Sequence, residues 1–429
     1  MKPPPRSGNG SHPRVRRIPR TRPRRSRVAV VVIVVVFLLT TLLLGWFGVE
    51  DLEKALTFPG RITGAVLIVV ALTTLLGAAA VVDHWFWNSF AYSGLVALIG
   101  ASAAFLTNAM LLVETCKNGE SRFWPTVLGV LTAGSAWAVF VVWRTSVVIP
   151  APKRLAAALI VSSAIAVANF GYQSLYEPSQ RTAKPLIKLT MGTPVLSQDR
   201  KAFAVPVDIS LENHSDVGFY VLGTEIHAMG ERVTLSAKDR LRQQWRADAE
   251  QWNNFQEKNP LSRREVHQPG ELVAAQPVMP YGEWIEENDS YTTRVVVQMP
   301  INTPYDRVAF YASASFARKD RLGLGPALRF EGYSWGGGHV PRWMKSPDLD
   351  SVVYRGRVHE NNAIDEYTRE TRYVSVYWSF GTHGASVSTV IARNGEDKTA
   401  PSDSGSRYGL VDSETGPIER TLWDIKKTQ

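Results

Sequence analysis

Residues 28–49 read VAVVVIVVVFLLTTLLLGWFGV, and these 22 uncharged residues follow directly on an arginine-rich tail. At a rise of about 1.5 Å per residue, the stretch forms a helix of about 33 Å, which is long enough to cross the hydrocarbon core of a bilayer. A cleaved signal peptide would have a shorter apolar run that ends in a small-residue cleavage site. The stretch therefore predicts a retained transmembrane helix.

The basic charge of the chain is concentrated in its tail, residues 1–27. The tail carries Lys2 and nine arginines, or +10, whereas the whole chain of 429 residues carries +9. Its Pro-, Gly- and Arg-rich composition predicts a disordered cytoplasmic segment. The arginines from Arg14 to Arg27 could attract anionic lipid headgroups, but we favour a role as a topology signal alone. Because the charge is not spread over a folded face, nucleic-acid binding is not expected.

Four more apolar stretches extend the membrane region over residues 28–172, for which we expect an α-helical bundle. The expected spans are residues 28–49, 62–82, 89–113, 125–143 and 155–172. The last is the shortest, with 18 residues or about 27 Å, and is still long enough to cross. Aromatic residues gather near the ends of the spans, as is typical of the headgroup level.

The distribution of Lys and Arg predicts the orientation of the bundle. With the tail in the cytoplasm, the inner segments hold thirteen basic residues and the outer loops only four. This asymmetry fits the positive-inside rule. Five crossings then place residues 173–429 outside the cell, at the plasma membrane. If residues 155–172 lay in the interface instead, the C-terminal domain would be cytoplasmic.

Small residues recur at four-residue spacing within the spans, as at Gly100 with Ala104 and along Ala158, Ser162 and Ala166. Such residues let helices approach closely in lipid. We favour packing within the bundle, and the seam of a homo-oligomer is the alternative. No ionisable residue lies near the middle of a span, which argues against a transporter or channel.

The hydrophobic period changes to that of short strands in the C-terminal domain. Several runs alternate apolar and polar residues and end at turn-forming residues, which predicts an antiparallel, sandwich-like β-domain. The expected strands are residues 201–211, 217–228, 291–299, 305–317, 351–359, 372–380 and 385–392.

Two other segments are expected in this domain. Residues 236–255 carry Leu241, Trp245 and Trp252 on one helical face, which predicts an amphipathic helix. We favour packing of this face on the sheet over contact with a membrane or a partner. Residues 394–417 are rich in Gly, Ser and Asp, which predicts a long flexible loop.

No motif in the sequence predicts catalysis, a cofactor or a metal. There is no Gly-Lys dipeptide for a phosphate-binding loop, no Gly-x-Ser-x-Gly and no Ser-x-x-Lys. The segment 359–363 reads HENNA, with alanine where a zinc-binding helix needs its second histidine. Acidic pairs occur at Glu286, Glu287 and Asp289, and at Asp348 with Asp350, and we regard them as solvated loops. The single cysteine, Cys116, excludes an intramolecular disulfide, which fits a bacterial envelope.

The segment most suggestive of ligand contact is YSWGGGHVPRW, residues 333–343. Glycines permit close approach of a ligand, and aromatic rings offer flat apolar faces for stacking on envelope sugars. We favour the alternative of a tight turn whose tryptophans fill the core. The residues concerned are Tyr333, Trp335, Gly336, Gly337, Gly338 and Trp343.

The sequence as a whole predicts a five-span, non-enzymatic membrane protein. It would hold an extracytoplasmic β-domain of about 250 residues that binds an envelope glycan or an envelope protein. The first alternative is an envelope hydrolase that uses carboxylates of the β-domain. The second is a small-molecule transporter or channel.

Overall fold

The structure is a computed structural model that falls into two compact units, each described here by itself. Unit 1 comprises residues 1–46, 67–112 and 126–151, and unit 2 comprises residues 47–66, 113–125 and 152–429. The structure describes residues 24–87, 89–90, 92–145, 183–232, 246, 270–325, 327–336, 340–344, 349–382, 384–396 and 404–423.

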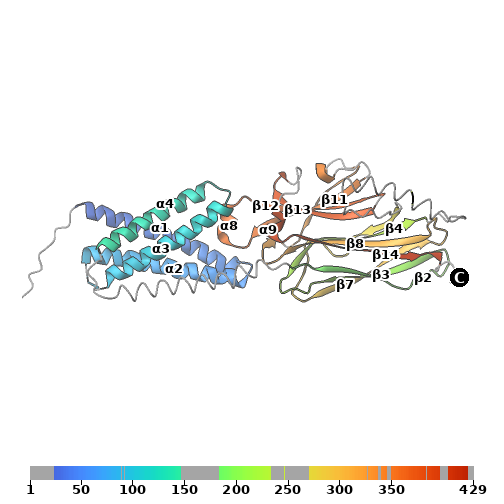
Figure 1. Cartoon of the computed structure of the whole chain (residues 1–429), viewed down its shortest axis with the longest axis horizontal. Coiled ribbons are helices and arrows are strands. Elements are labelled where there is room, and N and C mark those ends of the chain that lie inside the picture. The colour runs from blue at the N-terminus through green and yellow to red at the C-terminus, as the bar shows by residue number, and fades with distance from the viewer. Residues whose placement is uncertain are drawn as a thin grey trace, which may run out of the picture. The chain divides into compact units, whose positions relative to one another are not determined.

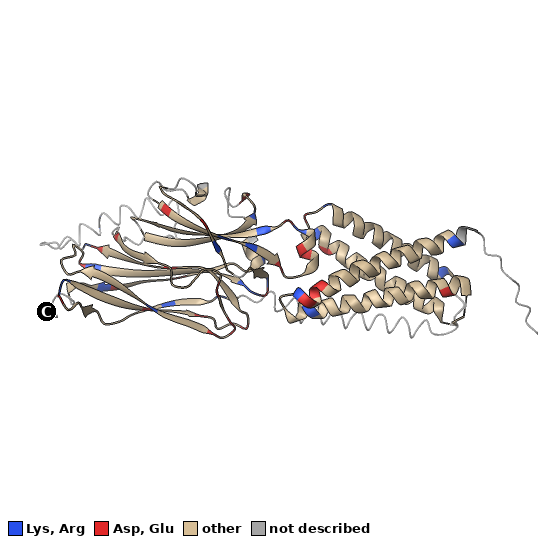
Figure 2. Cartoon of the chain, turned by 180° about the vertical axis from the view of Figure 1, so that it is seen from behind, with Lys and Arg blue, Asp and Glu red and all other residues tan. Residues whose placement is uncertain are grey.

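Four long helices carry the apolar stretches of the first third of the chain (Figure 1). They are α1 (Arg24–Lys54), α2 (Phe58–Val82, followed by the π-turn η1, Asp83–Trp87), α3 (Ser93–Asn118) and α4 (Phe123–Thr145). All four are long and apolar enough to cross a membrane. Charged residues gather at the helix ends and are sparse between them (Figure 2). The first four predicted spans are therefore confirmed as membrane-capable helices, and the fifth, residues 155–172, lies outside the described residues.

Unit 1 is packed through small residues on the facing sides of its helices. A Cβ atom added at Gly77 of α2 would lie 2.9 Å from the Cα of Gly100 in α3. Gly100 and Ala104 are buried in this bundle, which accords with the favoured role in internal packing. The buried Asn108 side chain donates a hydrogen bond to Thr40 Oγ1 over 3.0 Å, which gives its amide nitrogen a partner in an apolar setting.

Unit 2 is mainly β-structure. Its described helices are α8 (Ala363–Thr368), α9 (Ser404–Tyr408) and the 3₁₀ turn η3 (Arg342–Met344), besides the ends of α1–α4. The strands are β1 (Leu186–Met191), β2 (Val195–Leu196), β3 (Ala202–Glu212), β4 (Phe219–Glu231), β5 (Glu271–Gln276), β6 (Trp284–Ile285), β7 (Ser290–Pro300), β8 (Arg307–Arg318), β9 (Leu322–Leu324), β10 (Arg329–Ser334), β11 (Leu349–Glu360), β12 (Arg372–Gly381), β13 (Gly384–Arg393) and β14 (Val411–Thr421).

The strands form three antiparallel sheets, here called sheets A, B and C. In sheet A, β3 pairs with β7 on one side and with β1 and β2 on the other. Sheet B runs β14-β8-β4, with β5 and β6 both paired to β4. Sheet C runs β10-β11-β12-β13, with β9 also paired to β11.

Sheet B is the middle layer, because hydrophobic cores cover both of its faces. One core joins Phe310 and Phe316 of β8 to Val205 and Val297 of sheet A. The other joins Leu222 of sheet B to sheet C. Strand β8 is accordingly buried along nearly its whole length, whereas the outer strand β7 alternates exposed and buried residues. The predicted sandwich is thus a stack of three sheets.

All seven predicted strands are confirmed, each within a few residues of its expected bounds. The predicted loop 394–417 is wrong in its second half, where α9 and the first residues of β14 lie. Gly416 and Pro417 lie at a register shift in β14, an edge strand where a proline is tolerated. The predicted helix over 236–255 lies outside the described residues, apart from Arg246.

The close approach of sheets B and C at Gly223 predicts a stability effect. A Cβ atom at Gly223 would lie 2.5 Å from Val387 and 2.8 Å from Val376, so Gly223→Val should force the two sheets apart. We expect a loss of about 1–3 kcal/mol in the free energy of unfolding. Thermal unfolding of the purified chain, followed by tryptophan fluorescence, measures this loss. Gly332→Val is the control, because a Cβ there meets no atom within 4 Å; equal melting temperatures for the two variants would contradict the prediction.

Candidate functional site

The helix-connecting segments of unit 2 are bonded to its β-domain. Near the end of α1, the buried Asp51 carboxylate accepts a hydrogen bond from the Ala363 amide over 2.6 Å. Ala363 begins α8, whose N-cap residue Asn362 accepts a hydrogen bond from the Asp365 amide. Asp51 thus satisfies one of the backbone amides that the start of a helix leaves without a partner.

Glu120, in the turn between α3 and α4, is bonded to the β-domain through both its backbone and its side chain. The amides of Glu120 and Ser121 each donate to the Thr368 carbonyl over 3.1 Å. The Glu120 carboxylate accepts from the Glu370 amide over 3.0 Å and forms an ion pair with Arg372. Burial disfavours the charged form of Glu120, but the bonds from Arg372 and from the Glu370 amide prevail and lower its pKa to about 2.

The network continues into the β-domain through a second partly buried carboxylate, that of Glu360, whose side chain is 9% exposed. It pairs with Arg369 over 3.1 Å and accepts a hydrogen bond from the Tyr408 hydroxyl over 2.5 Å. Arg407 lies 3.8 Å from Glu360 and 2.9 Å from Asp365, so it bridges the two carboxylates. Burial raises the pKa of Asp365, which Arg407 partly opposes.

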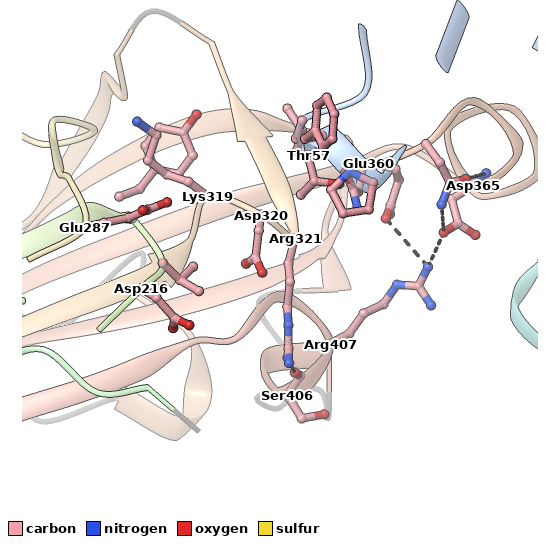
Figure 3. Close-up of a pocket in the computed structure, with 18 of the residues that line it drawn as sticks. Thr57, Asp216, Glu287, Lys319, Asp320, Arg321, Glu360, Asp365, Ser406 and Arg407 are labelled. Carbon is pink, nitrogen blue, oxygen red and sulfur yellow. Dashed lines mark hydrogen bonds and ion pairs between the residues drawn. The ribbon is translucent and has the colours of Figure 1, made fainter. Parts of the chain in front are cut away.

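A cleft of about 1310 Å³ opens beside this network within unit 2 (Figure 3). Its wall includes apolar residues of the α1–α2 connection, such as Leu56 and Phe58, and polar residues from the turns of the β-domain. Seven carboxylates and three cations line it, and the cations are Lys319, Arg321 and Arg407.

One corner of the cleft binds an ammonium group of the chain itself. Lys319 Nζ lies 2.8 Å from Glu286 Oε1, 4.8 Å from the ring centroid of Trp284 and 5.9 Å from that of Tyr220. Rings and a carboxylate around an ammonium are the usual elements of cation recognition.

Three carboxylates of the cleft form ion pairs with the cations that line it. Glu360 and Asp365 share Arg407, and Glu286 is paired with Lys319. Among the described residues, no group of three or more His, Cys, Asp or Glu side chains is arranged to hold a metal ion.

The structure separates the residues of the predicted ligand loop. Tyr333 and Trp335 are 58% and 59% exposed, so the favoured interpretation of core-filling tryptophans is wrong for Trp335. They lie at the end of β10, an edge strand with mostly exposed side chains. Trp343 is half-buried in η3 and packs edge-to-face on Tyr377 at 6.0 Å. Gly336 donates its amide to Asp350, whereas Gly337 and Gly338 lie outside the described residues.

The two exposed rings join two others from β12 in a cluster that we call the aromatic patch: Tyr333, Trp335, Trp378 and Phe380. Ring centroids are 5.3 Å apart for Tyr333 and Trp335, 6.3 Å for Trp335 and Phe380, and 5.2 Å for Phe380 and Trp378. Strand pairing sets this arrangement, because Tyr333 and Trp378 both lie opposite Val352 of β11.

Other residues considered from the sequence lie apart. Glu286 and Glu287 line the cleft, Asp289 does not, and Asp348 lies outside the described residues. Sequence reasoning missed a pair on β4, where His227 lies 2.9 Å from the buried Glu225 and stacks on Tyr311. The spacing of two along a strand, which places both side chains on one face, was the available signal.

Comparisons with known proteins do not identify a family. No protein-family model matches the chain, and no curated protein sequence matches it. One similar solved structure is the crystal structure of Spo0M, a sporulation control protein from Bacillus subtilis, at 8% identity over 57% of this chain and 93% of that chain. Its TM-score of 0.18 is too low to support any argument about fold or function.

The depressed pKa of Glu120 predicts a pH-dependent contribution to stability. Glu120→Gln removes the charge that Arg372 and Arg393 contact, so we expect a loss of about 1–3 kcal/mol in the free energy of unfolding at pH 7. Because the pKa of Glu120 is lowered in the folded state, the extra free energy of unfolding of the wild type is complete above pH about 4.5. This difference disappears as the pH falls towards 2. Unfolding curves of both chains between pH 2 and 7 measure it. The exposed Glu283→Gln is the control, and a pH-independent difference would refute the assignment.

Proposed function

We propose that the protein is a five-span membrane protein that holds a ligand-binding β-domain at the outer face of the plasma membrane. The observation that carries the proposal is the bonding of Asp51 and Glu120 to the β-domain. Asp51 lies in the last turn of the membrane-capable helix α1, and Glu120 lies in the turn between the membrane-capable helices α3 and α4. The β-domain therefore belongs on the same side of the membrane as these two segments.

The fifth crossing is inferred from the course of the chain. Helix α4 begins at Phe123, beside Glu120, and its 23 residues carry the chain about 34 Å away to Thr145. Because Glu120 is bonded to residues 368–372, the chain must return across the membrane before the β-domain. Residues 155–172 are the uncharged stretch available for that return.

The positive-inside rule supplies the direction. Thirteen basic residues fall on the side of the N-terminal tail and four on the side of the two bonded connections. The same assignment places the tail in the cytoplasm and the β-domain outside the cell.

Binding is assigned to the aromatic patch. Exposed rings arranged side by side suit stacking on the apolar faces of sugar rings, and Asp350 lies opposite Phe380 as a hydrogen-bond acceptor at its edge. The ligand class proposed is an envelope glycan, and catalysis is not part of the proposal.

Thiol labelling in intact cells tests the topology. Cys116 is exposed near the end of α3, so a membrane-impermeant maleimide should label it. The second site is Asp412→Cys on the exposed part of β14, made in a Cys116→Ser background, and the same reagent should label it. Ser7→Cys, in the tail and in the same Cys116→Ser background, should react only after the cells are broken open. Labelling of Ser7→Cys but not of Asp412→Cys in intact cells would reverse the orientation.

Sedimentation with insoluble envelope polysaccharide tests the glycan assignment. The double variant Tyr333→Ala and Trp335→Ala should bind at least about tenfold more weakly, because each ring contributes about 1 kcal/mol to such stacking. Trp423→Ala, which removes a half-exposed ring outside the patch, is the matched control and should bind like the wild type. Equal binding by the double variant would refute the assignment.

A further inference from the structure

The cleft of unit 2 has an apolar end and a charged end. Leu56 lies between α1 and α2, and Phe58, which is 75% exposed, is the first residue of α2. Both helices are membrane-capable, and their candidate spans end at Lys54 and begin at Phe58. These two apolar side chains therefore lie at the level where a membrane span meets the headgroup region.

The charged end has an excess of carboxylates. Of the seven that line the cleft, Glu286 is paired with Lys319, and Asp365 with Arg407. Arg318 and Arg369, from outside the lining, neutralise two more, Asp320 and Glu360. Seven carboxylates against three cations in the lining is a negative excess, and it favours a ligand with a cationic group over a purely anionic one.

The cleft already shows that it can hold an ammonium, since Lys319 lies against Glu286 and Trp284.

The cleft also offers a place for an anionic group. Arg321 extends through its middle towards Ser406, to whose carbonyl it donates over 2.8 Å (Figure 3). Burial and the neighbouring Arg318 lower the pKa of Arg321, so a phosphate beside it would stabilise the charged guanidinium.

From this geometry we propose that the cleft binds the headgroup of a zwitterionic phospholipid with a primary ammonium, of the phosphatidylethanolamine class. The ammonium would lie among the carboxylates that include Glu287, the phosphate beside Arg321, and the first acyl carbons against Leu56 and Phe58. This site is separate from the aromatic patch and does not depend on glycan binding.

Equilibrium dialysis of the full-length purified chain in detergent tests the proposal. The probes are radiolabelled short-chain phosphatidylethanolamine, phosphatidylglycerol with the same chains, and free phosphoethanolamine. We expect saturable binding of phosphatidylethanolamine, at least tenfold tighter than that of either other probe.

Charge reversal identifies the site. Glu287→Lys changes an exposed residue of the cleft wall and should weaken phosphatidylethanolamine binding at least fivefold. Glu283→Lys makes the same change four residues away, outside the lining, and should alter binding less than twofold. Equal binding of the two lipids, or no effect of Glu287→Lys, would overturn the proposal. Equally tight binding of phosphoethanolamine would overturn the lipid assignment in favour of a soluble ligand.

Discussion

The Glu120 carboxylate forms an ion pair with Arg372 and lies 3.4 Å from Arg393 and 3.8 Å from Arg369. A partly buried carboxylate is costly unless cations and hydrogen bonds surround it, and here three arginines and the Glu370 amide do so. Arg369 and Arg393 also pair with Glu360 and Glu370 of the β-domain, whereas the ion pair of Arg372 is with Glu120. Separation of the α3–α4 turn from the β-domain would therefore leave the charges of Glu120 and Arg372 without each other as partners.

The middle position of sheet B imposes a second constraint. A sheet covered on both faces needs small side chains where its neighbours approach, and β8 supplies them at Ala309, Ala312 and Ala314. Polar groups on its covered faces must find partners within the protein. Glu225 does so by accepting from Ser313 and pairing with His227, although burial still raises its pKa.

Patterns along the sequence predict the elements better than they predict the site. Uninterrupted apolar runs and strict alternation are local properties of the sequence, and they predicted four helices and seven strands. Two-residue strands such as β2 and β6 are too short to show a period, so the sequence could not predict them. The Glu120 ion pair joins residues 252 positions apart, which no local pattern reports. Trp335 was expected in the core because tryptophan is mostly buried, but an edge strand leaves one of its sides uncovered.

The two candidate surfaces suit different ligands for electrostatic reasons. In the cleft, Glu286 and Asp365 already have cationic partners within the chain, so a cationic ligand gains little at these two carboxylates. The aromatic patch gains in another way, because rings such as Tyr333 and Trp335 present apolar area to water and are stabilised when a ligand covers it. A neutral ligand with a flat face therefore gains most binding free energy at the patch. Selectivity among charged headgroups can arise only in the cleft, where a ligand charge without an opposite charge beside it weakens binding.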